Sequence, residues 1–189
     1  MTRIIAGFAG SRELKVPKQG TRPTSDRVRE ALFSALESAD LIRGSRVLDL
    51  YAGTGALGLE ALSRGAKHVA LVENNLKAFK IIKANARLVA HSGGRESGSY
   101  EVRGESVGRF VAGTRDVWNL VLIDPPYTVT NDELELVLAT LAREMTRDGV
   151  VVVERSTRTP VFKAPERMTI IRTQEYGDTS LIWLEIVDY

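Results

Sequence analysis

The sequence predicts an α/β fold in which helices cover both faces of a mostly parallel β-sheet. Two observations support this prediction. From about Ser45, short apolar strands alternate with helical patterns, a rhythm typical of strand–helix–strand units. Near the end of the chain the rhythm changes, because residues 169–173 and 181–187 flank Gly177 in the pattern of a hairpin. We therefore expect an antiparallel hairpin to complete the sheet.

The composition is that of an ordinary globular protein. The 189 residues are 43% apolar and 26% charged, and this apolar content is enough to form a hydrophobic core without disulfide bonds. The chain has no cysteine, which excludes disulfides and zinc–thiolate sites, and its two histidines supply a metal site poorly. No signal pattern is present, and no apolar run approaches the roughly 20 residues that span a bilayer. We expect a cytoplasmic protein without a metal.

The expected elements follow in order along the chain. Residues 1–23 form a basic N-terminal extension with a β-hairpin, and residues 24–189 form the main domain. Thr24 or Ser25 caps the first helix. Further strands are expected at 46–50, 69–72, 100–103, 120–123 and 150–153, with helices at 57–63, 76–89 and from Asn131. The glycine-rich stretch 92–99 is expected to be a mobile loop at a sheet edge.

The first motif is the strand and glycine-rich turn over residues 47–58. Gly53 and Gly55 allow the backbone to turn tightly and to approach a ligand closely, because they lack a Cβ. Glu73 closes the next strand, where a carboxylate can accept hydrogen bonds from ribose hydroxyls. This pattern predicts a nucleoside cofactor, and both NAD and S-adenosylmethionine (SAM) have the ribose that it requires.

Asp49 favours SAM over NAD. A carboxylate just before the turn repels a pyrophosphate, whereas SAM has no phosphate and carries a cationic sulfonium and ammonium. Glu105 follows the third strand of the main domain, where an acid can contact the adenine amino group. The candidate cofactor-binding residues are Asp49, Tyr51, Gly53, Thr54, Gly55, Glu73, Asn74, Glu105 and Ser106.

The second motif is a strand that ends in Asp124-Pro125-Pro126-Tyr127. An exocyclic amine on a purine is a poor nucleophile, because its lone pair is delocalised into the ring. Two acceptors, the Asp124 carboxylate and the Pro125 carbonyl, can hold both N–H hydrogens and turn the lone pair towards a methyl donor. The prolines fix the backbone beforehand, and Tyr127 offers a face for an extruded base. The four residues are the candidate catalytic residues for methyl transfer to nitrogen.

The N-terminal region is strongly basic. Residues 1–29 contain seven basic and two acidic residues, which indicates a polyanionic partner, although a solvated arm explains the charge equally well. The candidate RNA-binding residues are Arg3, Arg12, Lys15, Lys18, Arg22 and Arg29. Arg155 and Arg158, after the strand at 150–153, are further candidates for a phosphate contact.

The whole chain resembles the small-subunit ribosomal RNA guanine-N2 methyltransferases of the RsmD type. The resemblance covers about residues 2–185 and includes the segments 3–7, 21–24, 29–33, 57–66 and 176–179. It implies a Rossmann-like, SAM-dependent methyltransferase fold with seven strands. It also implies methylation of one guanine N2 in 16S rRNA of the 30S subunit, by a monomer that holds RNA with its N-terminal hairpin.

Several alternatives remain open at this point. An adenine-N6 DNA or RNA methyltransferase and a protein glutamine methyltransferase would use the same Asp-Pro-Pro-Tyr chemistry. A DNA enzyme needs a target-recognition domain for which the chain has little room. An NAD-dependent oxidoreductase would leave Asp49 and the second motif unexplained. A non-catalytic RNA-binding protein would have no use for two amine acceptors.

Overall fold

The computed structural model describes residues 2–17 and 25–187. A small hairpin consists of β1 (Thr2–Arg3) and β2 (Glu13–Leu14). The strands of the large sheet are β3 (Arg46–Leu50), β4 (His68–Val72), β5 (Ser99–Arg103), β6 (Trp118–Ile123), β7 (Met145–Ser156), β8 (Met168–Tyr176) and β9 (Thr179–Ile186). The helices are α1 (Asp26–Ser38), α2 (Ala56–Ser63), α3 (Leu76–Gly93), the 3-10 helix η1 (Gly94–Glu96), α4 (Val107–Gly113) and α5 (Asn131–Leu141).

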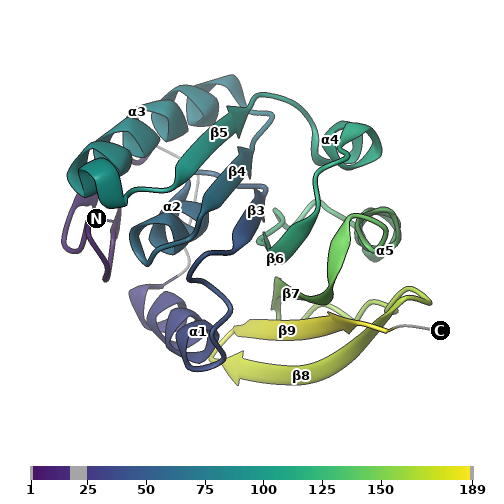
Figure 1. Ribbon diagram of the computed structural model, residues 1–189. Helices are drawn as coiled ribbons and strands as arrows, with labels where there is room; N and C mark the ends of the chain where they lie inside the picture. The colour runs from purple at the N-terminus through teal and green to yellow at the C-terminus, as the bar shows by residue number, and fades with distance from the viewer. Residues whose placement is uncertain (1, 18–24, 188–189) are drawn as a thin grey trace.

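The large sheet has seven strands in the order β5-β4-β3-β6-β7-β9-β8 (Figure 1). The first five of these strands run parallel to one another, whereas β9 is antiparallel to both of its neighbours, β7 and β8. The predicted α/β fold with an antiparallel C-terminal hairpin is therefore confirmed. Among the described residues, no helix is long and apolar enough to cross a membrane.

Helices cover the sheet on both faces, with α1, α2 and α3 on one face and α4 and α5 on the other (Figure 1). The buried side chains of β3 alternate between the two layers, as the period of a strand requires. Val47 packs into the layer of α1 to α3, and Leu48 and Leu50 pack into the layer of α4 and α5. Helix α4 was not expected from the sequence.

Helix α3 is longer than its sequence pattern predicts. It continues to Gly93 and is followed directly by η1, so the prediction of a mobile loop over 92–99 is wrong for most of that stretch. The helix end packs against the N-terminal hairpin, because a Cβ at Gly93 would lie 2.6 Å from the ring of Phe8. Packing against a distant segment thus extends the helix through residues that favour a loop locally.

The strands of the N-terminal hairpin are shorter than predicted, because beyond Ile4 the backbone of the hairpin bonds to helix side chains. The backbone N–H groups of Ile5 and Ala6 donate to the buried Glu60 carboxylate of α2 at 2.7 and 3.0 Å. The backbone of Lys15 pairs with the Asn85 side chain of α3. The hairpin is therefore joined to the main layer, and the expected boundary between residues 23 and 24 lies outside the described residues.

Replacing Gly7 by alanine should destabilise the protein by about 3 kcal/mol or more. Gly7 has φ +81°, and a Cβ there would lie 1.9 Å from the Ser63 carbonyl oxygen of α2. Gly44→Ala is the matched control, since Gly44 has φ +74° with nothing within 4 Å. The control should lose only about 1 to 2 kcal/mol. Urea denaturation measures both, and equal losses would contradict close packing of the hairpin on α2.

Candidate active site

Three parallel strands end level with one another at one edge of the sheet. Leu50, the last residue of β3, pairs with the last residues of both β4 and β6. The loops that follow therefore begin side by side, with Tyr51, Glu73 and Asp124 as their first residues. The two motifs that the sequence analysis identified meet at this edge, where open parallel sheets bind their ligands.

The turn between β3 and α2 uses three residues with left-handed backbone conformation: Tyr51 at φ 60°, Gly53 at 57° and Gly55 at 81°. Glu73 holds this turn, because one carboxylate oxygen accepts from the Gly53 N–H at 3.0 Å and the other from the Asn75 N–H at 2.7 Å. Each oxygen retains a further lone pair for a ligand hydroxyl. The neighbouring Asn74, also a candidate cofactor residue, is exposed.

Asn85 of α3 connects this turn to the N-terminal hairpin. Its side chain is 1% exposed and donates to the carbonyl oxygens of Thr54 at 2.9 Å and Lys15 at 3.0 Å, while its own oxygen accepts from the Lys15 N–H at 2.8 Å. One amide thus positions both the cofactor turn and the basic hairpin. Asn85 was not predicted as a functional residue. The only indication in the sequence is a polar side chain on the apolar face of a helix.

The Asp49 carboxylate lies inside the protein, against the start of α2. It accepts from the Gly58 N–H at 2.8 Å and so caps α2, whose own N-cap residue, Gly55, has no side chain to do so. A Cβ at Gly58 would lie 3.0 Å from this carboxylate. Asp49 is 1% exposed, so its carboxylate serves the start of α2, and its assignment as a cofactor-binding residue stays a prediction.

Burial raises the pKa of Asp49 to about 8, against the opposing hydrogen bond from Gly58. The charges of Asp124 and Glu73 raise it further, so the three acids form one electrostatic cluster at the edge of the sheet. A bound cation would relieve the repulsion among them. A pyrophosphate, by contrast, would meet a carboxylate at the helix start where dinucleotide folds offer free N–H groups. The site thus fits a cationic nucleoside such as SAM.

The Asp124-Pro125-Pro126-Tyr127 segment forms a rigid elbow after β6. Both prolines are preceded by trans peptide bonds, and Pro125 is buried. The Val129 N–H donates to the Pro126 carbonyl at 3.0 Å, which closes a turn with Tyr127 inside it. The Tyr127 side chain is 85% exposed. The elbow therefore presents a flat aromatic face to solvent, next to the partly exposed Asp124 carboxylate.

Arg155 of β7 supports the far end of this elbow. Its guanidinium donates to the Val129 carbonyl at 3.1 Å and to the Asn131 side chain at 2.9 Å, and burial lowers its pKa. Two of its nitrogens therefore serve the loop, which weighs against the phosphate contact considered from the sequence. Burial and the Glu133 carboxylate raise the pKa of Tyr51, whereas Arg155 lowers it. Tyr51 thus lies within reach of the elbow as well as in the cofactor turn.

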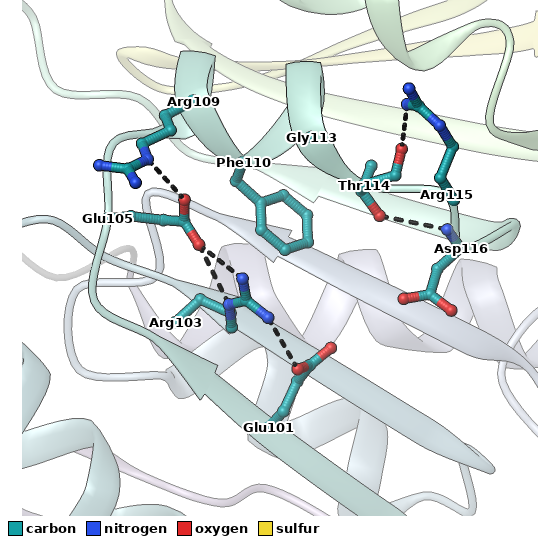
Figure 2. A pocket seen from close by; sticks show the side chains of 9 residues that line it. All are labelled: Glu101, Arg103, Glu105, Arg109, Phe110, Gly113, Thr114, Arg115 and Asp116. Atoms are coloured by element: carbon teal, nitrogen blue, oxygen red, sulfur yellow. Dashed lines mark hydrogen bonds and ion pairs between the residues drawn. The ribbon is translucent and has the colours of Figure 1, made fainter.

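Glu105 lines a separate hollow of about 260 Å³ between β5 and α4 (Figure 2). The Glu105 carboxylate forms ion pairs with Arg103 at 2.9 Å and Arg109 at 3.7 Å. The Ser106 hydroxyl caps α4 by accepting from the Arg109 N–H. None of the three clustered acids lines this hollow. Each Glu105 oxygen retains a further lone pair, so contact with an adenine amino group stays a prediction.

Three of the candidate RNA-binding residues, Arg3, Arg12 and Lys15, are exposed on the N-terminal hairpin. Lys18 and Arg22 lie outside the described residues. No ion pair among the described residues involves Arg3, Arg12 or Lys15. Their charges are therefore available to a polyanion.

The expectation that Arg29 contacts RNA is wrong. Its side chain is 1% exposed and donates to the Arg3 carbonyl at 2.9 Å and to Asp26 at 2.6 Å. A second nitrogen lies 4.0 Å from the buried Glu60. Arg29 therefore joins α1 to the hairpin and to α2.

Comparisons with known proteins agree with this fold. The family described as Conserved hypothetical protein 95 matches residues 2–185. Ribosomal RNA small subunit methyltransferase D of Haemophilus influenzae is 33% identical over 94% of this chain and 90% of its own length. YlbH of Bacillus subtilis is 30% identical over 95% and 96%. A Thermus thermophilus structure, TTHA0928, has a TM-score of 0.83 at 28% identity over 98% of this chain and 100% of its own. The chain belongs to the RsmD/YlbH family of methyltransferases.

Proposed function

We propose that this protein transfers the methyl group of SAM to the exocyclic N2 of a guanine in 16S rRNA of the 30S subunit. One observation carries the proposal. At the same edge of the sheet lie an acidic turn that suits a ribose and a rigid Asp-Pro-Pro-Tyr elbow. The Haemophilus influenzae relative, a ribosomal RNA small subunit methyltransferase, supports the choice of substrate.

The elbow acts by holding the amine. Asp124 accepts one N–H of the guanine amino group, and the Pro125 carbonyl accepts the other. No hydrogen bond among the described residues occupies that carbonyl. With both hydrogens drawn out of the plane of the base by these acceptors, the nitrogen becomes pyramidal, and its lone pair is no longer delocalised into the ring and can point at the methyl group. Because the prolines fix the acceptors before the substrate arrives, orientation supplies much of the rate.

The cofactor turn supplies the other half of the site. Glu73 would hold the ribose hydroxyls, and the backbone at Gly53 and Gly55 would lie against the nucleoside. Bound SAM supplies an electrophilic methyl group on a cationic sulfur, which the negative charges of Glu73 and Asp124 favour. Asp124 need not act as a strong base, since the methylated amine readily loses its proton.

Labelled methyl transfer to three substrates tests this proposal. Undermethylated 30S subunits, naked 16S rRNA and duplex DNA are each incubated with the protein and methyl-labelled SAM. Label in rRNA is expected. Label only in DNA or in ribosomal protein would favour the adenine-N6 or glutamine alternatives. No label in any substrate, together with tight binding of NAD, would favour an oxidoreductase and contradict the proposal.

Tyr127→Ala should raise the KM for RNA by about 10-fold to 100-fold, because base–aromatic stacking contributes about 1 to 3 kcal/mol. The side chain is 85% exposed, so its removal should leave the fold and SAM affinity unchanged. Tyr127→Phe is the matched control and should retain the wild-type KM. Steady-state kinetics on rRNA measures both variants. Wild-type values of KM and kcat for the alanine variant would contradict a role of Tyr127 in binding the base.

A further inference from the structure

Helix α3 carries a row of basic side chains along its exposed face. Lys77, Lys80, Lys83 and Arg87 follow one another at spacings of three and four residues, and all four are exposed. Such spacing places them on one side of a helix, over a length of about 15 Å. We call these four residues the α3 basic row.

No acidic side chain among the described residues forms an ion pair with this row. Helix α3 itself contains no acidic residue over its 18 positions. Lys83 lies 5.5 Å from the ring of Phe79, a contact that leaves its charge intact. Like charges at these spacings destabilise a helix, and cations near its N-terminus oppose the helix dipole. The row therefore costs stability in the free protein.

Helix α5, in the opposite layer, has the opposite charge. Helix α5 carries Asp132, Glu133 and Glu135 and no basic residue. Since α3 and α5 cover different faces of the sheet (Figure 1), the molecule is electrically polarised across the sheet. A polyanion approaching the protein is steered towards the α3 side.

The row also connects the two regions that the proposed function assigns to SAM and to RNA. Its first member, Lys77, lies four residues after Glu73 of the cofactor site. The same helix contacts the basic hairpin twice, through Asn85 to Lys15 and through Gly93 to Phe8. Cations on the row therefore continue those of Arg3, Arg12 and Lys15 on the hairpin towards the edge where Asp124 and Tyr127 lie.

We infer that the α3 basic row is a binding track for the phosphate backbone of the RNA that enters the active site. The inference rests on the proposed function for the identity of the RNA. The row indicates the path that the RNA strand takes across the protein. Lysine and arginine contacts to phosphate position a nucleic acid without reading its sequence. The row thus contributes affinity and orientation, whereas the elbow selects the amine.

The salt dependence of RNA binding tests the track. The test variant is Lys77→Gln, Lys80→Gln, Lys83→Gln, Arg87→Gln, and filter binding measures its affinity for transcribed 16S rRNA and for 30S subunits between 50 and 200 mM salt. Each lost phosphate contact lowers the slope of log K against log salt by about 0.7 for single-stranded RNA. We expect the slope to fall by about 2 to 3 and the affinity at 50 mM salt to fall at least about tenfold.

A control variant removes the same charge from the other edge of the sheet. Arg43, Lys67, Arg143 and Arg167 are exposed and precede β3, β4, β7 and β8, respectively. Replacing all four by glutamine should change the slope by less than 1. A double variant, Lys80→Gln with Arg87→Gln, should show about half of the full effect. All variants should bind SAM as the wild type does, which also shows that they are folded.

The outcomes separate the track from the proposed function. Equal slopes for the test and control variants, with normal methylation by the wild type, would overturn the track and leave the proposed function intact. A loss confined to 30S subunits, with naked 16S rRNA bound normally, would assign the row to an acidic ribosomal protein and also overturn it. Failure of the wild type to methylate any RNA would contradict the proposed function itself.

Discussion

Replacing Asp124 by alanine should lower kcat for methyl transfer by about 100-fold to 1000-fold, a loss comparable to that of one preorganised hydrogen-bonding group in other active sites. The residue begins the loop after β6, level with the cofactor turn, and its charge reaches Asp49. Without Asp124, the amine keeps only the Pro125 carbonyl as an acceptor, and the nitrogen lone pair remains delocalised into the ring. Single-turnover kinetics on rRNA measures the loss directly.

Binding distinguishes a loss of chemistry from a loss of substrate. The Asp124→Ala variant should bind rRNA with wild-type affinity, because the hairpin and the elbow turn remain. Asp124→Asn keeps one acceptor oxygen and should recover part of the rate. Asp132→Asn, which changes an exposed acid at the start of α5, is the control and should methylate normally. Normal turnover by Asp124→Ala would show that the amine is held elsewhere.

Replacing Asp49 by asparagine should remove most of the pH dependence of stability between pH 4 and pH 8. Asp49 has a pKa of about 8 in the folded protein and about 3.8 as a free side chain. The unfolded chain therefore ionises across this interval while the folded protein stays protonated, so wild-type stability falls as the pH rises. A pKa difference of this size corresponds to on the order of 5 kcal/mol.

Asparagine can keep the hydrogen bond from the Gly58 N–H, so the variant should be more stable than the wild type at pH 8 and similar to it at pH 4. Urea denaturation at several pH values measures this difference. Asp148→Asn, at an exposed acid of β7, should leave the wild-type profile unchanged. Parallel profiles for wild type and Asp49→Asn would contradict a buried, protonated Asp49.

The same protonation should affect cofactor binding. A cation near Asp49 favours its ionised form, so SAM should bind wild type more tightly as the pH rises from 6 to 8. The asparagine variant has no proton to release and should lose this dependence.

The sequence predicted the strands and turns of the site well, because they depend on local patterns. The apolar run before Asp49 and the run before Asp124 predicted parallel strands, and parallel strands bring their carboxyl ends to one edge. By contrast, α4 was missed, since it is a single short helix with three buried residues. Whether the assigned residues bind SAM and RNA stays a prediction.

The errors came from contacts between residues far apart in the chain. Counting charges placed Arg29 on the RNA surface, although Glu60 and the hairpin bury it. Asp49 was identified as an acid near the cofactor turn, but its hydrogen bond to the start of α2 could not be predicted, because it depends on how the following helix packs. Asn85 bonds to Lys15, 70 residues earlier, and no local pattern indicates such a bond. Composition and periodicity contain little of this information.

Mass spectrometry of the methylated nucleoside tests the central claim most directly. Undermethylated 30S subunits are treated with the protein and labelled SAM, and the rRNA is then digested to nucleosides. N2-methylguanosine at one methyl group per subunit is the predicted product, absent when Asp124→Ala replaces the wild type. N6-methyladenosine, or label on a ring nitrogen or a ribose oxygen, would contradict the guanine-N2 assignment.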